Sequence, residues 1–598
     1  MYRAPLKDLE FVLHELIGPE ALNGCPDLAD YSAELGSSVL AEAARFAETV
    51  LAPLNQPGDR EGAHWTPEGV QAPTGFKEAY RQFVEGGWPQ LGASAQFGGQ
   101  AVPAMLASAV QEIWASANLA FKLCPMLTHG AAHALEITGT PEQKQLYLPK
   151  MVSGEWTGTM VLTEPQAGSD LGLIRTQAVP QGDHYRLFGQ KIFITWGDHD
   201  YTDNIIHMVL ARIEGAPPGT RGISMFIVPK VLVRPDGSLG ERNEVRCVSI
   251  EHKLGIHASP TCVLAFGEKQ GAVGYLVGEA NHGLEYMFIM MNTARLAVGL
   301  EGYSVAEAAF QLAAEWARTR IQGKPPAGSG SGACAGSAAS AAIIRHPDVK
   351  RMLLTMKANI AAMRALALYS ASRLDVARHH REASVRSAAQ ARVDLLIPIV
   401  KGWCTECGAE VASTGIQVHG GMGYIEETGA AQFLRDVRIT LIYEGTTGIQ
   451  ANDLIGRKIG RDGGTAMREL IAEMRSELAH PAQEQSAPSV RRAALEGVEL
   501  LERATASLLT LMAPSPARAA AVAVPYLKLC GVTIGGWLMA RTAALAAARR
   551  TGAGAELYAG RLEAARFYAE QLLPNALTLA RIVEQGSASV VDAQDRLI

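Results

Sequence analysis

The feature that most constrains this chain is a change in the period of its apolar residues at two points. Up to about residue 155, apolar residues recur every three or four positions, as in "SSVLAEAARFAETVLAPLN", which predicts helices. Between about 156 and 280, β-favouring runs such as "HYRLFGQKIFIT" and "GISMFIVP" alternate with turn-rich pieces, which indicates a small antiparallel barrel or sandwich. Helical spacing then returns at "GLEYMFIMMNTARLAVGLEGYSV". The chain is therefore predicted to be mainly α with a central β domain.

The same pattern predicts several domains. A chain of 598 residues, at roughly one domain per 150 residues, has room for about four. Charged residues make up only 19% of the chain, which indicates much internal or subunit-facing surface. The low-complexity stretch "PPAGSGSGACAGSAASAA" at 325–342 is expected to be a surface loop. The expected domains are an N-terminal helical domain (1–155), a β domain (156–280), a helical bundle (281–460) and an additional helical domain (461–598).

Charge and hydropathy exclude several classes of partner. The chain carries 54 basic and 60 acidic residues without a long run of either sign, so a nucleic-acid partner is not expected. The start of the chain lacks the pattern of a secretory signal. The most apolar late stretch, "LCGVTIGGWLMA" at 529–540, is too short to span a bilayer. A cytoplasmic protein without a membrane span is predicted.

The cysteines do not predict a metal site. Eight are present, mostly isolated in apolar surroundings, which is typical of packed side chains in a reducing compartment. Cys404 and Cys407 have CxxC spacing, but no second pair follows at zinc-ligand distance. Packing within a helix is the preferred interpretation, and no metal ligand is assigned.

Two glycine-containing stretches are candidates for cofactor binding. In "VLTEPQAGSDLG" at 161–172, Thr163 and the turn-forming "AGSD" offer a hydroxyl and backbone N–H groups to a polar planar ligand. In "QVHGGMGYIEE" at 417–427, Gly420 and Gly421 permit close approach of the backbone to a bulky group. Either stretch alone could be ordinary loop punctuation.

Glu444 is the candidate general base. It stands in "LIYEGTTGIQANDLIGRKI", just ahead of a helix that is expected to start at Thr446 or Thr447. Residues Thr447 to Gln450 match a capping box. The positive end of that helix favours the ionised carboxylate, which could accept a proton. The alternative is an acid that only supports the helix start.

Arg295 is a candidate anion-binding residue. It falls on the apolar stripe formed by Leu284, Phe288 and Met291. A guanidinium on an apolar face usually has an anionic partner.

These motifs together resemble the acyl-CoA dehydrogenase family over roughly residues 1–460. "LTEPQAGSD", "GQKIFITWG", "QVHGGMGYIEETGAAQFLRD" and "IYEGTTGIQANDLIGRKI" occur in the family's order and approximate spacing. The start "YRAPLKDLEFVLHEL" and the helical tail are similar to a long bacterial branch. That branch includes 3-(methylthio)propanoyl-CoA dehydrogenase-like and broad-chain fatty acyl-CoA dehydrogenases, and this similarity spans nearly the whole chain.

The resemblance implies a fold and a reaction. The fold would be an N-terminal helical domain, a β-barrel or sandwich and a C-terminal four-helix bundle, plus an extra helical domain. FAD would lie between the β domain and the bundle, with acyl-CoA stacked against the flavin. Glu444 would remove the α-proton while the β-hydride passes to flavin N5, giving trans-2-enoyl-CoA, and an electron-transfer flavoprotein would take the electrons. A role in fatty acid β-oxidation, and thus in lipid metabolism, follows from the resemblance.

The resemblance also implies roles for particular residues. Glu444 would be the catalytic base, and Ser169, Glu444 and Gly445 would contact the substrate. The residues implied to contact FAD are Thr163, Gly168, Ser169, Phe193, Ile194, Thr195, Arg295, Gln417, Gly420, Gly421, Thr446 and Gln450.

The chain departs from the family pattern at two places. Phe193, followed by Trp196, stands where many relatives have tryptophan in a "WIT" triplet, so the aromatic group beside the flavin could differ. The segment "RTRIQGKPPAG" replaces the family's "RxxFGK", so Arg320 is not assigned to the cofactor.

Two other functions remain open for a chain with this resemblance. An oxidase of the same fold would return electrons to oxygen, and a flavin-bearing binding partner would need no working base. The intact "YEGT" around Glu444 argues against the binding partner. A homodimer is predicted, because the segment 461–598 should cover surface that shorter relatives use for tetramer contacts.

Overall fold

The computed structural model describes residues 2–326, 340–480, 487–549, 551–552 and 554–597. The low-complexity stretch 325–342 therefore lies mostly outside the described residues. The chain forms two compact units, and the four-part division expected from the sequence stays a prediction. The helical unit comprises Met1–Ala44, Ala104–Ser116 and Val298–Ile598, and the β unit comprises Arg45–Pro103 and Ala117–Ala297.

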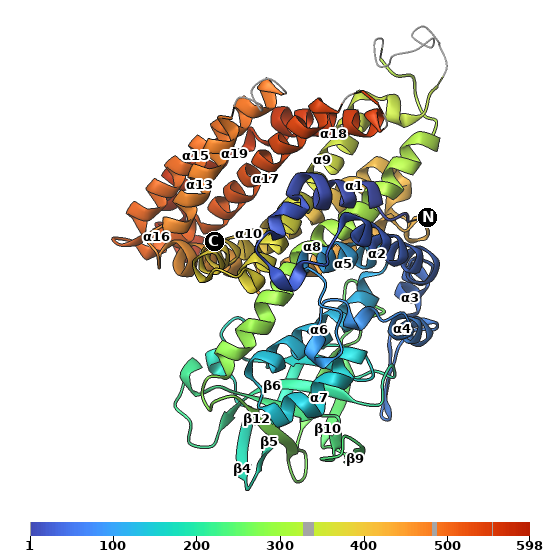
Figure 1. Ribbon diagram of the computed structural model, residues 1–598, viewed down its shortest axis with the longest axis vertical. Helices are drawn as coiled ribbons and strands as arrows, with labels where there is room; N and C mark the ends of the chain where they lie inside the picture. Colours follow the sequence, from blue (N-terminus) through green and yellow to red (C-terminus); the bar gives the residue numbers. More distant parts are fainter. Residues whose placement is uncertain (1, 327–339, 481–486, 550, 553, 598) are drawn as a thin grey trace. The chain divides into compact units, whose positions relative to one another are not determined.

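Long helices build the helical unit (Figure 1). Its central helices α9 and α10 form an antiparallel hairpin, and helical spacing returns at α8 as predicted. The helices up to α12 are α1 (Leu6–Phe11), α2 (Ala33–Phe46), α5 (Ala104–Ala117), α8 (Gly283–Thr319), α9 (Pro347–His379), α10 (Ala383–His419), α11 (Ala430–Val437) and α12 (Thr447–Asp453); α2, α5 and α8 each extend across a boundary between the units.

The C-terminal helices form a bundle around α17 in the same unit. Figure 1 shows α13, α15, α17 and α19 side by side. A Cβ added at Gly531 would meet the Trp403 ring at 2.2 Å, so glycine is what lets α17 pack closely on α10. The helices are α13 (Thr465–Leu478), α15 (Pro488–Met512), α16 (Pro516–Ala521), α17 (Ala523–Ala548), α18 (Ala555–Phe567), α19 (Asn575–Gln585) and α20 (Ser587–Val591).

Helix α17 is longer and more apolar than the sequence pattern suggested. Among the described residues it alone has the length and composition to cross a membrane, but 83% of its apolar window is buried inside the protein. A core helix of this kind is apolar on every side because other helices surround it.

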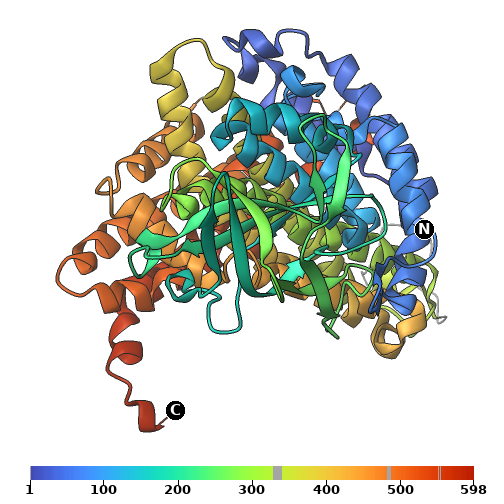
Figure 2. The same cartoon turned by 90° about the horizontal axis from the view of Figure 1, so that it is seen from below.

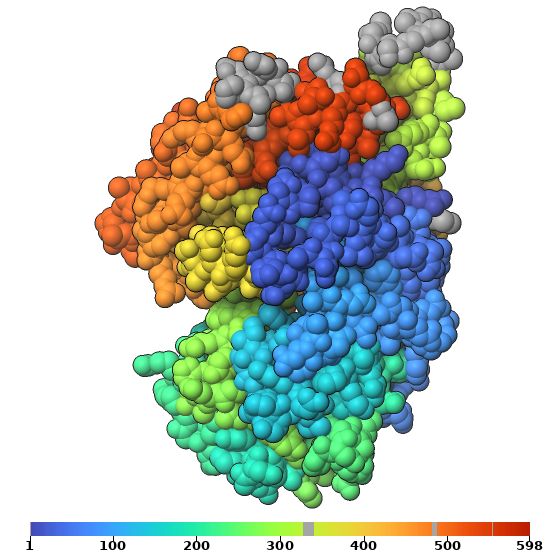
Figure 3. Space-filling model, viewed as in Figure 1, coloured from blue at the N-terminus to red at the C-terminus, as the bar shows by residue number. Residues whose placement is uncertain are grey.

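The N-terminal segment packs against these C-terminal helices. Arg561 of α18 donates to Asp8 Oδ1 at 3.0 Å, and Arg549 pairs with Glu15. Figure 3 shows the blue N-terminal segment lying beside the red C-terminal helices of the helical unit. The additional C-terminal segment is thus joined to the first residues of the chain.

A partly closed sheet forms the centre of the β unit (Figure 2). Its strand order is β10-β11-β5-β12-β7-β6-β3, and β4 pairs with both β5 and β6, so β5, β12, β7, β6 and β4 close into a ring. The strands are β3 (Thr157–Val161), β4 (Gln177–Gln181), β5 (His184–Thr195), β6 (Ile205–Ile213), β7 (Ser224–Pro229), β10 (Val245–Ile250), β11 (Thr261–Phe266) and β12 (Ala272–Val277); β8 (Val231–Val233) and β9 (Leu239–Arg242) pair separately.

Two details of the β prediction are wrong. Strands β3 and β4 both pair in parallel with β6, although an antiparallel sheet was expected. Alternation along a strand reports which face is buried and carries no information on the direction of its neighbour. The supposedly all-helical N-terminal region also contains a hairpin of β1 (His64–Thr66) and β2 (Gly69–Gln71). Both strands are too short for a period to be recognised.

Helices α3 (Ala52–Glu61), α4 (Phe76–Glu85), α6 (Leu119–Thr138) and α7 (Pro141–Ser153) complete the β unit. Helix α6 packs on β3, where a Cβ added at Gly158 would lie 2.7 Å from the Ala131 Cβ. The predicted class, mainly α with a central β domain, is confirmed.

Candidate active site

Glu444 lies in a short loop of the helical unit, directly ahead of α12. Thr446 is the N-cap of this helix, and its hydroxyl accepts a hydrogen bond from Ile449 N at 3.3 Å. The predicted helix start is confirmed, but the predicted capping box is wrong. The Gln450 side chain turns back to the loop and donates to Glu444 O at 2.9 Å and Gly445 O at 3.3 Å.

The backbone at Glu444 is held in an unusual conformation. Its φ is +57°, in the left-handed region that costs a non-glycine residue about 1–2 kcal/mol. Gly445 follows with φ +92°, and its carbonyl oxygen accepts a hydrogen bond from Lys401 Nζ at 2.6 Å. Lys401 and Gln450 are both fully buried. The two side chains fix the loop on which the half-buried Glu444 carboxylate stands.

The predicted nucleotide-contacting glycines lie at the exposed end of α10. Gly420 has φ +64°, and a Cβ added at Gly420 or Gly421 would meet no atom within 4 Å. At Gly423, by contrast, a Cβ would lie 2.4 Å from Ile416 O. Packing therefore explains Gly423 but not the other two, which leave open backbone beside exposed Gln417.

In the β unit, the loop that carries Thr163, Gly168 and Ser169 is anchored by the buried residue that follows Thr163. Glu164 accepts hydrogen bonds from Arg175 N at 2.6 Å and from Thr176 N and Oγ1 at 3.0 and 2.6 Å. Lys191 Nζ lies 2.9 Å from its carboxylate and donates to Leu162 O at 2.8 Å. This anchor leaves Gly168 and Ser169 exposed.

The charge of Lys191 helps to keep the Glu164 carboxylate ionised. Burial alone would raise the pKa of Glu164, but the Lys191 ammonium and the Thr176 hydrogen bonds together lower it to about 2. Burial lowers the pKa of Lys191 to about 8, although Glu164 opposes that change. Both groups are therefore charged at neutral pH. Glu164 lies within the predicted cofactor motif "VLTEPQAGSDLG", but nothing in the sequence indicates this anchoring role.

The end of β5 presents Phe193 outward. Two residues of β5, Ile192 and Phe193, oppose one residue of β11, which makes a bulge. Phe193 has φ +59° and is 58% exposed, whereas Ile194 packs its side chain into the sheet core. Ile192 N donates to Thr163 O at 2.9 Å. The structure thus brings Thr163 and the segment Phe193–Thr195 together.

Trp196 does not take the place of the family's exposed tryptophan. It is 1% exposed, its Nε1 donates to Ala120 O at 3.1 Å, and its ring lies 4.7 Å from the ring of Tyr201. Trp196 also has a positive φ, +51°, three residues after the outward-facing Phe193. Phe193 is therefore the aromatic side chain presented outward at this end of β5.

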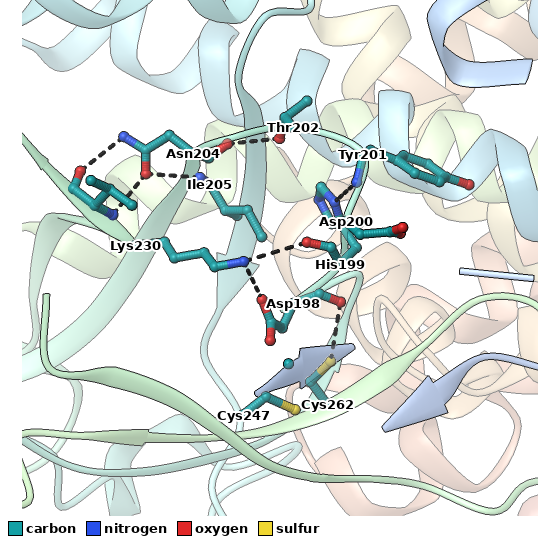
Figure 4. Close-up of polar contacts among 12 residues, drawn as sticks. Asp198, His199, Asp200, Tyr201, Thr202, Asn204, Ile205, Lys230, Cys247 and Cys262 are labelled. Atoms are coloured by element: carbon teal, nitrogen blue, oxygen red, sulfur yellow. Dashed lines mark hydrogen bonds and ion pairs between the residues drawn. The ribbon is translucent and has the colours of Figure 1, made fainter. Parts of the chain in front are cut away.

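An ion pair between buried Asp198 and half-buried Lys230 fixes the loop that follows Trp196 (Figure 4). Asp198 Oδ1 lies 2.6 Å from Lys230 Nζ, and Tyr201 N donates to His199 Nδ1 at 3.1 Å. Asn204 Oδ1 then accepts from two backbone N–H groups, at 2.8 and 3.0 Å. These contacts fix the loop that leaves the end of β5.

Arg295 lies on α8, in the part that belongs to the β unit. It is 4% exposed, and its guanidinium carbon lies 5.8 Å from the centre of the Phe288 ring. The predicted stripe therefore places both side chains on one side of the helix. The role of Arg295 toward an anion stays a prediction.

The predicted site residues fall into two groups. Gln417, Gly420, Gly421 and the segment from Glu444 to Gln450 belong to the helical unit, and Thr163, Gly168, Ser169, Phe193–Thr195 and Arg295 belong to the β unit. Lys401 was missed, because nothing in a helical segment shows that one lysine reaches a loop 44 residues later. Over the described ranges, no group of three or more metal-ligating side chains comes together.

Family models for the acyl-CoA dehydrogenases match most of the chain. The N-terminal domain model matches residues 37–155, the middle domain model 159–268 and the C-terminal domain model 334–459. A model described as acetyl-CoA dehydrogenase C-terminal like matches residues 470–594.

Curated relatives match over nearly their full length. The 3-methylmercaptopropionyl-CoA dehydrogenase of Ruegeria pomeroyi is 46% identical over 580 residues, which cover 96% of each chain. The broad-specificity linear acyl-CoA dehydrogenase FadE5 of Mycobacterium tuberculosis is 35% identical, over 98% of this chain and 97% of the relative.

Solved structures share the fold at lower identity. Caenorhabditis elegans ACDH-11, in complex with C11-CoA, has a TM-score of 0.75 at 18% identity and covers 98% of this chain and 95% of its own. The FAD complex of an acyl-CoA dehydrogenase from Bacillus anthracis has a TM-score of 0.70 at 20% identity, over 97% and 93%. The chain belongs to the acyl-CoA dehydrogenase family, a family of FAD-binding flavoproteins.

Proposed function

We propose that this protein is an FAD-dependent acyl-CoA dehydrogenase whose general base is Glu444. The observation that carries the proposal is the loop at Glu444, whose left-handed backbone is held by Gln450 and Lys401. A strained residue persists only where its surroundings impose the conformation, and such residues cluster at functional sites. The relatives named above act, by name, on acyl-CoA thioesters.

The reaction removes two hydrogens from adjacent carbons. Glu444 takes the α-proton of the thioester, and negative charge develops on the thioester oxygen. The Glu444 backbone N–H donates to that oxygen and stabilises the charge, as in an oxyanion hole. FAD, when held by the residues named below, would supply the acceptor for the hydride of the β-carbon, so that the product would be a trans-2-enoyl-CoA. The proton leaves the site when Glu444 releases it to solvent.

The residues present fit FAD. Phe193 offers an exposed aromatic ring, and the Thr163 loop beside it offers a hydroxyl and backbone N–H groups to the flavin. Gly420 and Gly421 leave open backbone that packing does not require, which suits close approach of a nucleotide. The proposed ligands are Thr163, Gly168, Ser169, Phe193, Ile194 through its backbone, Thr195, Arg295, Gln417, Gly420, Gly421, Thr446 and Gln450, with Ser169 and Gly445 also touching the substrate.

An electron-transfer flavoprotein is the proposed acceptor of the electrons. The alternative acceptor is oxygen, as in an oxidase of the same fold. Peroxide formed in proportion to acyl-CoA consumed would identify the oxidase. Turnover that needs an electron-transfer flavoprotein and forms no peroxide would support the dehydrogenase.

The test of the function is a panel of acyl-CoA thioesters mixed anaerobically with the holoenzyme. The panel contains 3-(methylthio)propanoyl-CoA, butyryl-CoA and longer linear acyl-CoAs, because relatives carry these substrates in their names. Bleaching of the flavin at about 450 nm by at least one thioester is expected. Failure of every member to bleach the flavin would refute the proposal.

We further propose that the protein is cytoplasmic and serves fatty acid β-oxidation. We also propose a homodimer, because the helices of residues 461–598 should cover surface that shorter relatives use for tetramer contacts. Light scattering of the holoenzyme should give the mass of two chains. A tetramer would contradict this part of the proposal alone.

A further inference from the structure

The loop at Glu444 is tied on both flanks to charged side chains inside the helical bundle. The Tyr443 hydroxyl donates to the carboxylate of Glu301 on α8. On the other flank, Lys401 Nζ of α10 donates to Gly445 O at 2.6 Å. The residue before the base and the residue after it therefore each bond to a different helix.

Burial of the Glu301 and Lys401 side chains costs hydration free energy, and filling the space does not require charged groups. Glu301 and Lys401 are each 0% exposed. An apolar side chain of similar volume would avoid the loss of hydration that a buried charge suffers. Burial, reinforced by the Glu301 carboxylate, raises the pKa of Tyr443 well above its ordinary value, so the hydroxyl stays protonated and remains a donor.

The two helices that carry these charges touch through their backbones. A Cβ added at Gly302 would lie 2.7 Å from Cys404 O, and one added at Gly408 would lie 2.2 Å from Gly302 O. A side chain larger than glycine at either position would therefore push the two helices apart. Glu301, beside Gly302, and Lys401, three residues before Cys404, therefore flank this close contact, one on each helix.

The loop that is bonded to these two helices contains a residue with a strained backbone, Glu444. Glu444 has φ +57°, and a non-glycine residue relaxes out of that region unless its neighbours prevent it. With Tyr443 and Gly445 both tied down, the chain cannot relax by rotating about Glu444. The direction of its carboxylate and of its backbone N–H is then set by the bundle.

We infer that Lys401, Glu301 and Tyr443 are positioning residues, which act through Glu444 by clamping the segment 443–445 in its left-handed turn. This inference rests on the proposed function, because it explains how the proposed base is aimed. A displacement of a catalytic group by about 1 Å can cost about 10²-fold in rate. The clamp should therefore affect the chemical step far more than substrate binding.

The test compares holoenzymes carrying Lys401→Met and, as a matched control, Lys458→Met. Lys458 Nζ lies 3.9 Å from Asp394, which stands on α10 like Lys401, so this lysine pairs with a carboxylate instead of with the carbonyl of Gly445. Lys401→Met should slow the limiting rate of anaerobic flavin reduction by about 10²-fold, with acyl-CoA affinity within about three-fold of wild type. Amide hydrogen exchange in the segment 443–450 should accelerate at least about ten-fold, and Lys458→Met should change neither quantity.

Two further variants guard against misfolding. Tyr443→Phe removes one hydroxyl and should slow reduction by about ten-fold. A ten-fold change in rate corresponds to about 1.4 kcal/mol, close to the lower end for a hydrogen bond to a charged group. The double variant Lys401→Met/Glu301→Gln removes both buried charges together and should slow reduction as much as Lys401→Met does. If Lys401→Met fails to fold, these two variants decide the matter.

The outcomes separate this inference from the proposed function. If no acyl-CoA bleaches the wild-type flavin, the proposed function fails, whereas the exchange measurement still decides whether the clamp exists. If the wild type is reduced but the folded clamp variants react and exchange within about two-fold of it, the inference is overturned. A loss of acyl-CoA affinity that equals the loss of rate would also overturn it, because it would show a general distortion of the site.

Discussion

Replacement of Glu164 by glutamine should loosen the loop that carries Thr163, Gly168 and Ser169. The Glu164 carboxylate accepts from Arg175 N and Gln166 Nε2 on one oxygen and from Thr176 on the other. Whichever way the new amide is turned, its NH₂ group faces a donor. The substitution also leaves the buried Lys191 ammonium without its counter-charge, although Leu162 O still accepts from it.

The expected cost follows from burial. Removing one member of a buried ion pair typically destabilises a protein by about 3–5 kcal/mol, because the other charge stays buried. We expect the lower value, about 3 kcal/mol, since some hydrogen bonds to the amide survive. For a cooperative unit of about 150–250 residues this corresponds to a fall in Tm of roughly 6–12 °C. Because the same loop offers groups to FAD, flavin should also be released more readily.

The pH dependence gives a second readout of the same residue. The pKa of Glu164 is lowered from its ordinary value of 4.5 to about 2 in the folded chain. Its stabilisation is therefore fully present above about pH 5 and is lost as the pH falls toward 2, by up to about 3 kcal/mol. In Glu164→Gln, the part of the stability loss between about pH 5 and pH 2 that comes from protonation of Glu164 should be absent. The double variant Glu164→Gln/Lys191→Met should recover part of the stability lost at neutral pH.

Thermal melts of the holoenzyme between pH 3 and 8, followed by flavin fluorescence, measure both effects. A control, Glu268→Gln, removes an exposed carboxylate that pairs with Arg246 at 2.6 Å and should shift Tm by no more than about 1 °C. The reasoning is refuted if Glu164→Gln melts within about 2 °C of wild type at neutral pH and keeps the full loss of stability in acid.

Three other substitutions test the site. Glu444→Gln should keep FAD and acyl-CoA affinity but slow anaerobic flavin reduction by at least about 10³-fold, and a rate within a few-fold of wild type would place the base elsewhere. Gly421→Ala should leave Tm unchanged within about 1 °C, because no atom lies within 4 Å of the new Cβ, but should lower FAD retention; unchanged retention would remove Gly421 from the cofactor site. Trp196→Phe should cost about 2–3 kcal/mol in stability, because it loses buried volume and the hydrogen bond to Ala120 O. Phe193→Ala should cost less than about 1 kcal/mol and should instead shift the flavin spectrum, because its side chain is exposed. Thermal melts and absorbance spectra that show the reverse ranking would contradict the assigned orientations.

Local signals in the sequence determined much of this protein. The period of the apolar residues predicted β5 at its observed bounds of His184–Thr195, and it predicted the return to helix at α8. The start of α12 was predicted at Thr446 or Thr447 from a capping-box match at Thr447–Gln450, and Thr446 does cap the first turn, although the box itself does not form. The candidate residues came from motifs of adjacent positions, and short-range geometry is sufficient to recognise such motifs.

Contacts between distant residues could not be predicted in this way. Nothing near Lys401 in the sequence shows that its ammonium reaches Gly445, and nothing near Glu164 shows that it pairs with Lys191. Gln450 matched a capping pattern, yet in the fold it donates to the carbonyl of Glu444. Each of these outcomes depends on how closely helices and strands approach, which the packing of side chains and glycines across the core decides.

The same distinction explains the two aromatic residues Phe193 and Trp196, which stand at and just beyond the end of β5. The sequence shows that Phe193 and Trp196 depart from the family pattern, but it does not show which of them faces outward. The bulge in β5 and the positive φ at each residue turn Phe193 outward and Trp196 into the core. The sequence by itself determined which residue types stand at the candidate site, and the tertiary structure decided their directions, because a side chain's direction depends on backbone geometry that distant strands impose.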